Sequence, residues 1–132
     1  MRLLLDTHVL LWWAADDARI GRALTQAIEH ALAAGERLGV CAITFWEIAK
    51  LVERERLRLA RSIDQVFDEL ERHPQITCLP LSPRICLEST RLGPRFHNDP
   101  ADQIIAATAR VHGLRLVTAD DRIRRSGVVA VV

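Results

Sequence analysis

Short runs of apolar residues alternate along the chain with longer stretches in which apolar positions recur every three or four residues. Brief, almost wholly apolar runs are typical of strands that are covered on both faces. The longer periodic stretches are typical of amphipathic helices. The pattern predicts strands at residues 2–5, 38–42, 76–79, 114–118 and 128–131.

Helices are predicted between these strands. The clearest is 20–34, where the apolar positions follow helical spacing and Gly35 marks the end. In residues 82–92, Ser82 is a suitable N-cap and a proline fills the first helical position. In residues 44–55, Thr44 and Glu47 have the spacing of a capping box. The remaining predicted helices cover residues 7–15, 63–72 and 100–112, with a short helical turn at 120–125.

The helix at 100–112 carries the most information. Asp99 is a suitable N-cap, Asp102 falls in the first turn and Gly113 ends the helix. The apolar run 104–109 covers so much of the helix circumference that we expect packing on two sides. Two carboxylates are therefore expected at the start of a helix whose body lies in the core.

The alternation of strands and helices predicts the α/β class. We expect a three-layer α/β/α sandwich around a mainly parallel sheet of four to five strands. A chain of 132 residues can build one substantial core and is too short for two, so a single domain over residues 1–132 is expected.

The composition indicates in which compartment the protein is expected. Apolar residues make up 49% of the chain and charged residues 27%, as in folded soluble proteins. No apolar run approaches the ~20 residues of a membrane span. Asp6 interrupts the N-terminal apolar run after three leucines, which argues against a signal peptide. We therefore expect a cytoplasmic protein with no membrane partner.

Charge and cysteine content argue against a protein that coats nucleic acid and against a disulfide-rich or zinc-binding protein. The net charge of +1 gives no global field of the kind found in proteins that coat nucleic acid. Cys41, Cys78 and Cys86 lack C-x-x-C spacing and lie among apolar residues. We expect buried, reduced thiols rather than a disulfide framework or a zinc site.

Acidic residues fall where the predicted strands end and where helices begin. In a parallel sheet these points share one edge, where ligands usually bind. At a separation of about 5 Å and a dielectric near 20, each like-charged pair costs roughly 3 kcal/mol. Helix caps, at about 1 kcal/mol each, would not offset that cost. Helix capping alone is the competing interpretation. We expect five carboxylates at this edge: Asp6, Glu47, Asp99, Asp102 and Asp120.

Such a cluster requires either a divalent cation or raised pKa values. Oxygen ligands without a thiolate or a histidine pair favour Mg²⁺ or Mn²⁺ over zinc. Magnesium held by carboxylates is the usual apparatus of phosphodiester chemistry.

Four segments in order resemble the successive motifs of PIN-domain ribonucleases, and more narrowly the VapC-type toxins of bacterial toxin–antitoxin pairs. The segments are Leu3–His8, Ile43–Ala49, His97–Asp102 and Leu116–Asp120. The resemblance covers essentially the whole chain and implies a PIN-like fold. It also implies a magnesium-dependent endoribonuclease that cleaves structured RNA, such as tRNA or rRNA loops, and forms a homodimer neutralised by a VapB-type antitoxin.

Carried over by position, the resemblance makes Asp6 and Asp102 the principal metal ligands, with Asp99 as a further ligand or a partner of the ligands. Glu47 and Asp120 would complete the acidic pocket. All five are catalytic candidates. Many relatives have arginine where this chain has Gln103, which removes one phosphate contact.

Several other side chains are secondary candidates. Thr7 and Thr118 flank the acids and can hydrogen-bond them or simply cap turns. His8 and His97 are more typical of surface residues than of catalytic acids. Residues that would contact RNA or a partner are Trp12, Trp13, Trp46, Arg54 and Arg56. For at least two of the aromatic residues Trp12, Trp13, Phe45 and Trp46 we instead expect packing in the core or in a dimer interface.

Three rival functions stay open at this point. A phosphotransferase with an aspartyl nucleophile commonly has a second acid two residues after the first, where this chain has His8. A silent RNA-binding or protein-binding module on the same fold would be expected to lose one of the acids. A processing nuclease without an antitoxin would keep them all.

Overall fold

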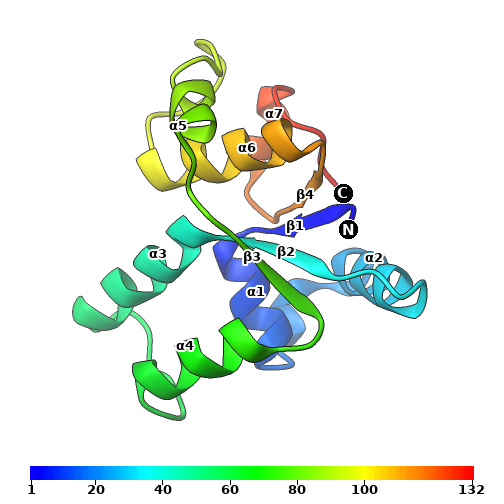
Figure 1. Ribbon diagram of the computed structural model, residues 1–132, viewed down its shortest axis with the longest axis vertical. Helices are drawn as coiled ribbons and strands as arrows, with labels where there is room; N and C mark the ends of the chain where they lie inside the picture. Colours follow the sequence, from blue (N-terminus) through cyan, green and yellow to red (C-terminus); the bar gives the residue numbers. More distant parts are fainter.

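Four parallel strands form the centre of the molecule. The computed structural model describes all residues from 1 to 132 and places the strands in the order β3-β2-β1-β4. The sheet is wholly parallel, with Leu4 opposite Gly39 and Leu116. Figure 1 shows β1 between β2 and β4, with both chain termini close to this part of the sheet. The strands are β1 (Leu3–Leu5), β2 (Leu38–Cys41), β3 (Ile76–Leu79) and β4 (Arg115–Val117).

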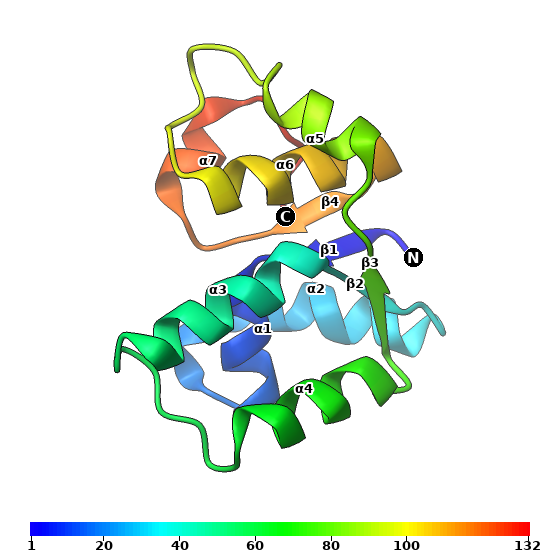
Figure 2. The same cartoon turned by 60° about the vertical axis from the view of Figure 1, so that its left-hand side comes forward.

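Helices cover both faces of the sheet. Figure 2 shows α5, α6 and α7 on one side and α1 to α4 on the other. The predicted three-layer α/β/α sandwich is therefore confirmed. The helices are α1 (Thr7–Ala14), α2 (Arg22–Ala33), α3 (Ala42–Glu53), α4 (Ile63–Arg72), α5 (Pro83–Ser89), α6 (Pro100–His112) and α7 (Asp121–Ser126), with a 3₁₀ turn η1 (Ala18–Ile20).

Two separate cores result from the alternation of side chains along the strands. Leu3 and Leu5 join the core beneath α1 to α4, whereas Leu4 points to the opposite core, which α6 fills with Ile105 and Ala106. All three leucines of β1 are buried. Strand β1 is thus covered on both faces, as its uninterrupted apolar sequence predicted.

Helix α6 has the caps and the packing that its sequence predicted. Asp99 is the N-cap and accepts a hydrogen bond from the Asp102 amide, and Gly113 ends the helix in the left-handed conformation at φ 65°. The helix packs against α5 on one side and against α3 and β4 on others. The residues 105–109 are all buried.

Three predicted boundaries were wrong. Residues 128–131 form no fifth strand, only a single parallel bridge from Val131 to Leu116. The helix predicted from residue 20 starts at Arg22, since Gly21 has φ 79° and interrupts helical geometry. The helix predicted to reach residue 92 stops at Ser89, ahead of the positive-φ Gly93 and its proline.

The capping box predicted at Thr44 and Glu47 was also wrong. Strand β2 runs directly into α3, so the helix begins at Ala42 and its N-cap, Cys41, makes no side-chain cap bond. Thr44 is fully buried and Glu47 lies in the second helical turn. The prediction of uniformly buried thiols was partly wrong, because Cys41 is buried but Cys78 and Cys86 are exposed. None of the helices is long and apolar enough to cross a membrane.

Candidate active site

The carboxyl ends of β1 and β4 place the first polar groups of the site. Asp6 follows β1 directly and Thr118 follows β4, and both side chains are buried. Thr118 Oγ1 donates a hydrogen bond of 2.7 Å to Asp6 Oδ2, and the Thr7 amide donates one of 2.8 Å to Asp6 Oδ1. Asp6 is also the N-cap of α1. Its carboxylate is therefore held in one orientation from two sides.

Glu47 reaches the same region from α3. Thr7 Oγ1 donates a hydrogen bond of 2.5 Å to Glu47 Oε1 and lies 3.1 Å from the hydroxyl oxygen of Thr44. The position of Glu47, one turn beyond the start of α3, lets it extend over the end of β1. Thr7 thus links the two carboxylates, because its amide bonds Asp6 and its hydroxyl bonds Glu47.

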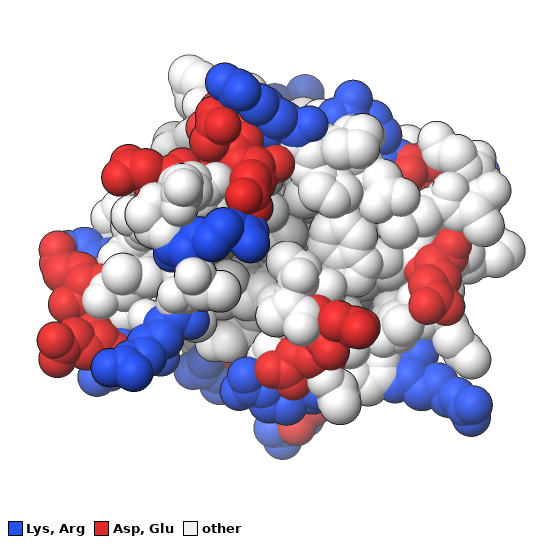
Figure 3. Space-filling model, turned by 90° about the horizontal axis from the view of Figure 1, so that it is seen from below, with Lys and Arg blue, Asp and Glu red and all other residues white.

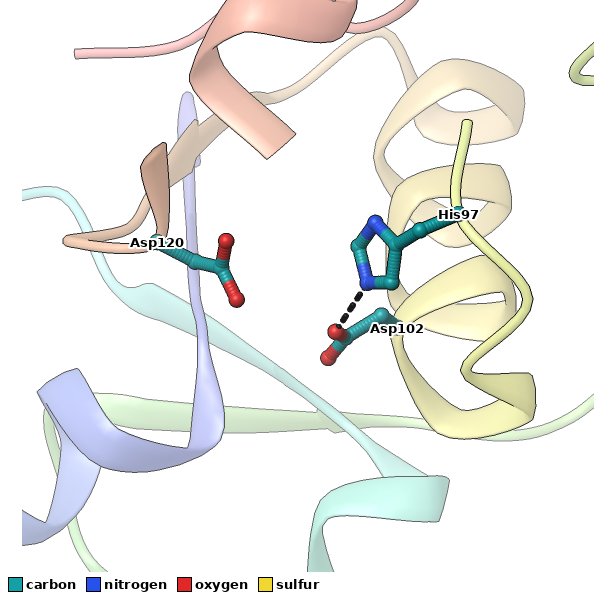
Figure 4. A group of neighbouring side chains, drawn as sticks. All are labelled: His97, Asp102 and Asp120. Carbon is teal, nitrogen blue, oxygen red and sulfur yellow. Dashed lines mark hydrogen bonds and ion pairs between the residues drawn. The ribbon is translucent and has the colours of Figure 1, made fainter. Parts of the chain in front are cut away.

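Asp102 projects from the first turn of α6 and is paired with a histidine from the preceding loop. His97 Nε2 lies 2.6 Å from Asp102 Oδ2, and the Nδ1 atom of His97 is buried without a partner. Figure 4 shows this pair facing Asp120, which comes from the opposite side of the site. The expectation that His97 is a surface residue was wrong, because its ring stacks on the buried Phe96. His8 is exposed, as expected.

Asp99 and Asp120 lie further out and cap helices. Asp99 is exposed and caps α6. Asp120 caps α7, where it accepts hydrogen bonds from the amides of Arg122 and Ile123. The guanidinium of Arg122 lies 3.1 Å from Asp120 Oδ2 and 3.8 Å from Asp102 Oδ2.

All five predicted carboxylates line one cavity of about 270 Å³. The set that the sequence placed at one edge of the sheet is therefore brought together, although the role of each residue stays a prediction. The lining residues are Asp6, His8, Trp12, Glu47, Asp99, Asp102, Ala119, Asp120 and Arg122.

Burial changes the proton affinity of the inner carboxyls. It raises the pKa of Asp6, despite the opposing hydrogen bonds from Thr118 and Thr7. Burial, with the nearby charges of Asp102 and Asp6, raises the pKa of Glu47 to about 7. Burial also raises the pKa of Asp102 against the hydrogen bond from His97. These shifts are the physical cost of gathering buried acids without a cation.

Asp120 behaves in the opposite way. Its partial burial acts to raise the pKa, but hydrogen bonds from the side chain and amide of Arg122 outweigh burial and hold the pKa below its usual value. Asp120 is therefore already neutralised by a neighbouring cation within the protein.

The donor set fits a hard divalent cation. One ligand atom from each of Glu47, Asp99 and Asp102 lies within 4.8 Å of the others, and the same holds for His97, Asp102 and Asp120. Asp102 belongs to both sets. Asp6 belongs to neither, although it lines the same cavity. Carboxylate oxygens predominate, as Mg²⁺ and Mn²⁺ prefer.

The aromatic candidates divide between the site, the core and the surface. Trp12 lines the acidic cavity. Trp13 packs edge-on against His73, and Phe45 packs against Phe67. Both lie against the core, so of the two expected alternatives, core or dimer packing, these two residues show core packing. Trp46 is 52% exposed.

The arginine candidates lie elsewhere, and one arginine of the site was missed. Arg54 and Arg56 follow the end of α3, are exposed and do not line the acidic cavity. Arg122 was not among the candidates. Its only signal in the sequence is its place two residues after Asp120, in the first turn of a short helix.

Comparison with known proteins agrees with this geometry. The model of the PIN domain family matches residues 3–128. The chain belongs to the PIN domain family. This PIN domain is also 41% identical over 122 residues to Ribonuclease VapC22 of Mycobacterium tuberculosis (strain ATCC 25618 / H37Rv), with 92% of this chain and 89% of that protein covered. The resemblance noted from the four segments is confirmed.

Solved structures show the same fold. A DNA-bound VapBC from Salmonella typhimurium superimposes on this PIN domain with a TM-score of 0.69 at 16% identity, over 100% of this chain and 97% of that one. VapBC2 from Rickettsia felis, bound to a DNA fragment from its promoter, gives a TM-score of 0.68 at 16% identity, over 100% and 98%.

Proposed function

We propose that this protein is a metal-dependent endoribonuclease and the toxin of a type II toxin–antitoxin pair. The observation that carries the proposal is the convergence of five carboxylates from separate segments on one cavity. A relative with 41% identity over most of the chain is a ribonuclease, and the structural neighbours include VapBC proteins. We propose further that residues 1–132 act as one domain.

The proposed cofactor is Mg²⁺, with Mn²⁺ as a substitute. Asp102 is the central ligand, because it belongs to both groups of neighbouring ligand atoms. Asp99 and Asp6 are the other proposed ligands. A bound divalent cation supplies Lewis acidity and lowers the pKa of water at neutral pH.

The protein's own side chains orient the acids and accept protons. Thr118 and Thr7 fix the Asp6 carboxylate, and His97 fixes that of Asp102. Thr7 occupies Oε1 of Glu47, and Oε2 of Glu47 has no hydrogen-bond partner in the protein. We assign Glu47 Oε2 the role of accepting the proton of the attacking water. Asp120 completes the acidic pocket and holds Arg122 at its edge.

The proposed substrate is structured RNA, in tRNA or rRNA loops, and the proposed partners are a VapB-type antitoxin and a second copy of the chain in a cytoplasmic homodimer. The partner surface remains a proposal. Trp12, beside the acids, is a candidate for stacking on a base, and the exposed Trp46 is a candidate for contact with RNA or antitoxin. Trp13 packs against His73 and is therefore a weaker candidate for contact with a partner. Arg54 and Arg56 are the remaining exposed candidates.

The decisive experiment is cleavage of total RNA and of a tRNA pool by the purified protein. We expect cuts with Mg²⁺ that disappear on chelation and in Asp6→Asn, which removes one buried charge at nearly constant shape. Asp68→Asn is the matched control, because Asp68 is an exposed acid on α4 that pairs only with Arg72. Absence of cleavage by the wild type, together with no effect of Mg²⁺ on its thermal unfolding, would favour a silent binding module.

A further inference from the structure

A second, basic hollow lies beside the acidic cavity. It has a volume of about 420 Å³, and three arginines line it: Arg95, Arg122 and Arg125. The loop at 93–98 and helix α7 form its walls, and His97 lies between the arginines and Asp102. No acidic residue lines this hollow.

The acidic cavity and the basic hollow adjoin each other. Arg122 lines both of them, and His97 lines the hollow while its Nε2 atom contacts Asp102 in the cavity. A strand held in the cavity therefore has the hollow beside it, on the other side of Arg122 and His97.

Buried residues hold the walls of the hollow in place. Two of the three arginines that line it have no acidic partner. Phe96 is buried beneath the loop, and Ser126 is buried at the end of α7 and donates to the Ile123 carbonyl. Arg122 is paired with Asp120. Arg125 makes one bond, to the carbonyl of Asp121, and Arg95 has no ion pair. Most of the charge of Arg95 and Arg125 is thus available to an external anion.

The hollow can be compared with the arginines and acids on the rest of the surface. Near α4, Arg72 pairs with Asp68 and Arg61 pairs with Glu69, whereas Arg54, Arg56 and Arg58 make no ion pair but lie away from the acidic cavity. Figure 3 shows acidic and basic side chains interspersed on the face opposite α5 and α6. The hollow is different, because unpaired positive charge there adjoins a cluster of negative charge.

We propose that the basic hollow binds a backbone phosphate of the RNA strand next to the phosphate that is cleaved. This inference rests on the proposed nuclease function. Asp120 is paired with Arg122, but the other four carboxylates of the cavity repel a polyanion, so positive charge immediately beside the cavity favours binding of the strand. Arginine presents several N–H donors in a planar fork that matches phosphate oxygens. Arg95 and Arg125 are therefore assigned to the adjacent phosphate, with Arg122 between the two sites.

The test measures RNA binding separately from cleavage. A short fluorescent single-stranded RNA is titrated with protein in chelator, at several salt concentrations, and its anisotropy is recorded. The variants are Arg95→Gln and Arg125→Gln. Arg72→Gln is the matched control, because it removes the same charge from an exposed helix end that precedes β3, at the opposite edge of the sheet.

We expect Arg95→Gln and Arg125→Gln each to weaken binding about three- to tenfold and to reduce the slope of log K against log salt by about 0.7, the value for one phosphate on a single strand. Arg125→Lys is expected to restore part of the affinity. Arg72→Gln is expected to match the wild type. Equal behaviour of all three glutamine variants, or wild-type binding too weak to measure at low salt, would overturn the proposal. Displacement of the RNA by inorganic phosphate at equal phosphate concentration would also overturn it, in favour of a site for free anions.

A parallel cleavage assay with Mg²⁺ separates the two proposals. If the wild type cleaves RNA and the three glutamine variants bind RNA alike, the nuclease function stands and the phosphate site does not. If the wild type fails to cleave but Arg95→Gln and Arg125→Gln still lose binding, the hollow is a site for an RNA phosphate, and both the nuclease function and the place of that phosphate beside a cleaved one are overturned.

Discussion

The acidic cavity has a floor and a rim that differ in how their charges are satisfied. The floor consists of Asp6, Glu47 and Asp102, which are buried or half-buried and contact hydroxyl groups or His97. The rim consists of Asp99 and Asp120, which cap α6 and α7. The pKa of every floor carboxyl is raised, whereas that of Asp120 is lowered by Arg122.

This difference shows that the charged carboxylates of the rim and of the floor are stabilised in different ways. The rim acids are stabilised by helix N-termini and, at Asp120, by an arginine, so they contribute to folding without any ligand. The floor acids are costly in their charged form until a cation arrives. Asp6 also caps α1, so the difference between floor and rim lies in the burial and pKa of the carboxyls rather than in capping alone.

The largest expected effect is on cleavage. Asp102→Asn is expected to lower the rate by more than about 100-fold, the upper end of the range for residues that only support metal ligands. Asp99→Asn is expected to lower it less, because Asp99 is exposed and also serves as a helix cap. Initial rates on one RNA substrate at saturating Mg²⁺ measure both. Equal losses in the two variants would contradict the division between floor and rim.

The second effect is stabilisation by metal. At a Mg²⁺ concentration of 100 times Kd, the free energy of unfolding should rise by about 2.7 kcal/mol, since the unfolded chain has no assembled site. Denaturant unfolding with and without Mg²⁺ measures the change. Asp102→Asn should abolish it and Asp68→Asn should retain it. If Mg²⁺ still stabilised Asp102→Asn, the metal would have to bind outside the floor of the cavity.

The third effect is a dependence of stability on pH. The folded pKa of Glu47, about 7, exceeds its ordinary value of 4.5, so the folded state binds the proton more tightly. The contribution of Glu47 is therefore complete below about pH 4.5 and is lost as the pH rises through 7. In metal-free protein we expect a loss of about 1–2 kcal/mol over this window, after allowance for the partial exposure of Glu47.

Glu47→Gln isolates this contribution. It keeps an oxygen that can accept the hydrogen bond from Thr7 and removes the titrating group. Its curve of unfolding free energy against pH should be flatter than that of the wild type between pH 4.5 and 7. Parallel curves would show that other groups cause the dependence.

The smallest effect concerns the rim as a structural element. Asp99→Ala removes the cap of α6 and should lower the free energy of unfolding by about 1 kcal/mol. Asp99→Ser, which keeps a capping oxygen without the charge, should recover most of this loss. Chemical denaturation in chelator measures both variants. Failure of serine to recover stability would show that the charge, rather than the hydrogen bond, matters.

Much of the fold follows from local sequence. Strand β1 could be predicted from its uninterrupted apolar run, and helix α6 from its strong caps. The start of α3 could not, since β2 passes into it without a loop and no capping side chain marks the boundary. The segment at 128–131 has the composition of a strand, but it makes only one bridge to β4.

The sequence predicted which acidic residues form the site better than it predicted the contacts between them. Parallel strands bring their carboxyl ends to one edge, so the convergence of Asp6 with Asp102 and Asp120 follows from topology. The pairing of His97 with Asp102 depends on a loop whose path is set by burial of Phe96, which no periodicity reveals. The contact of Arg122 with Asp120 likewise depends on the position of the short helix α7.

The hydrogen bond between Thr118 and Asp6 spans 112 positions of the chain. It depends on the pairing of β1 with β4, the first and last strands to be synthesised. During translation, a chain that has not yet emerged as far as β4 has neither Thr118 nor Asp120 beside Asp6. The order of synthesis thus delays assembly of the acidic site until β4 and the residues that follow it have left the ribosome.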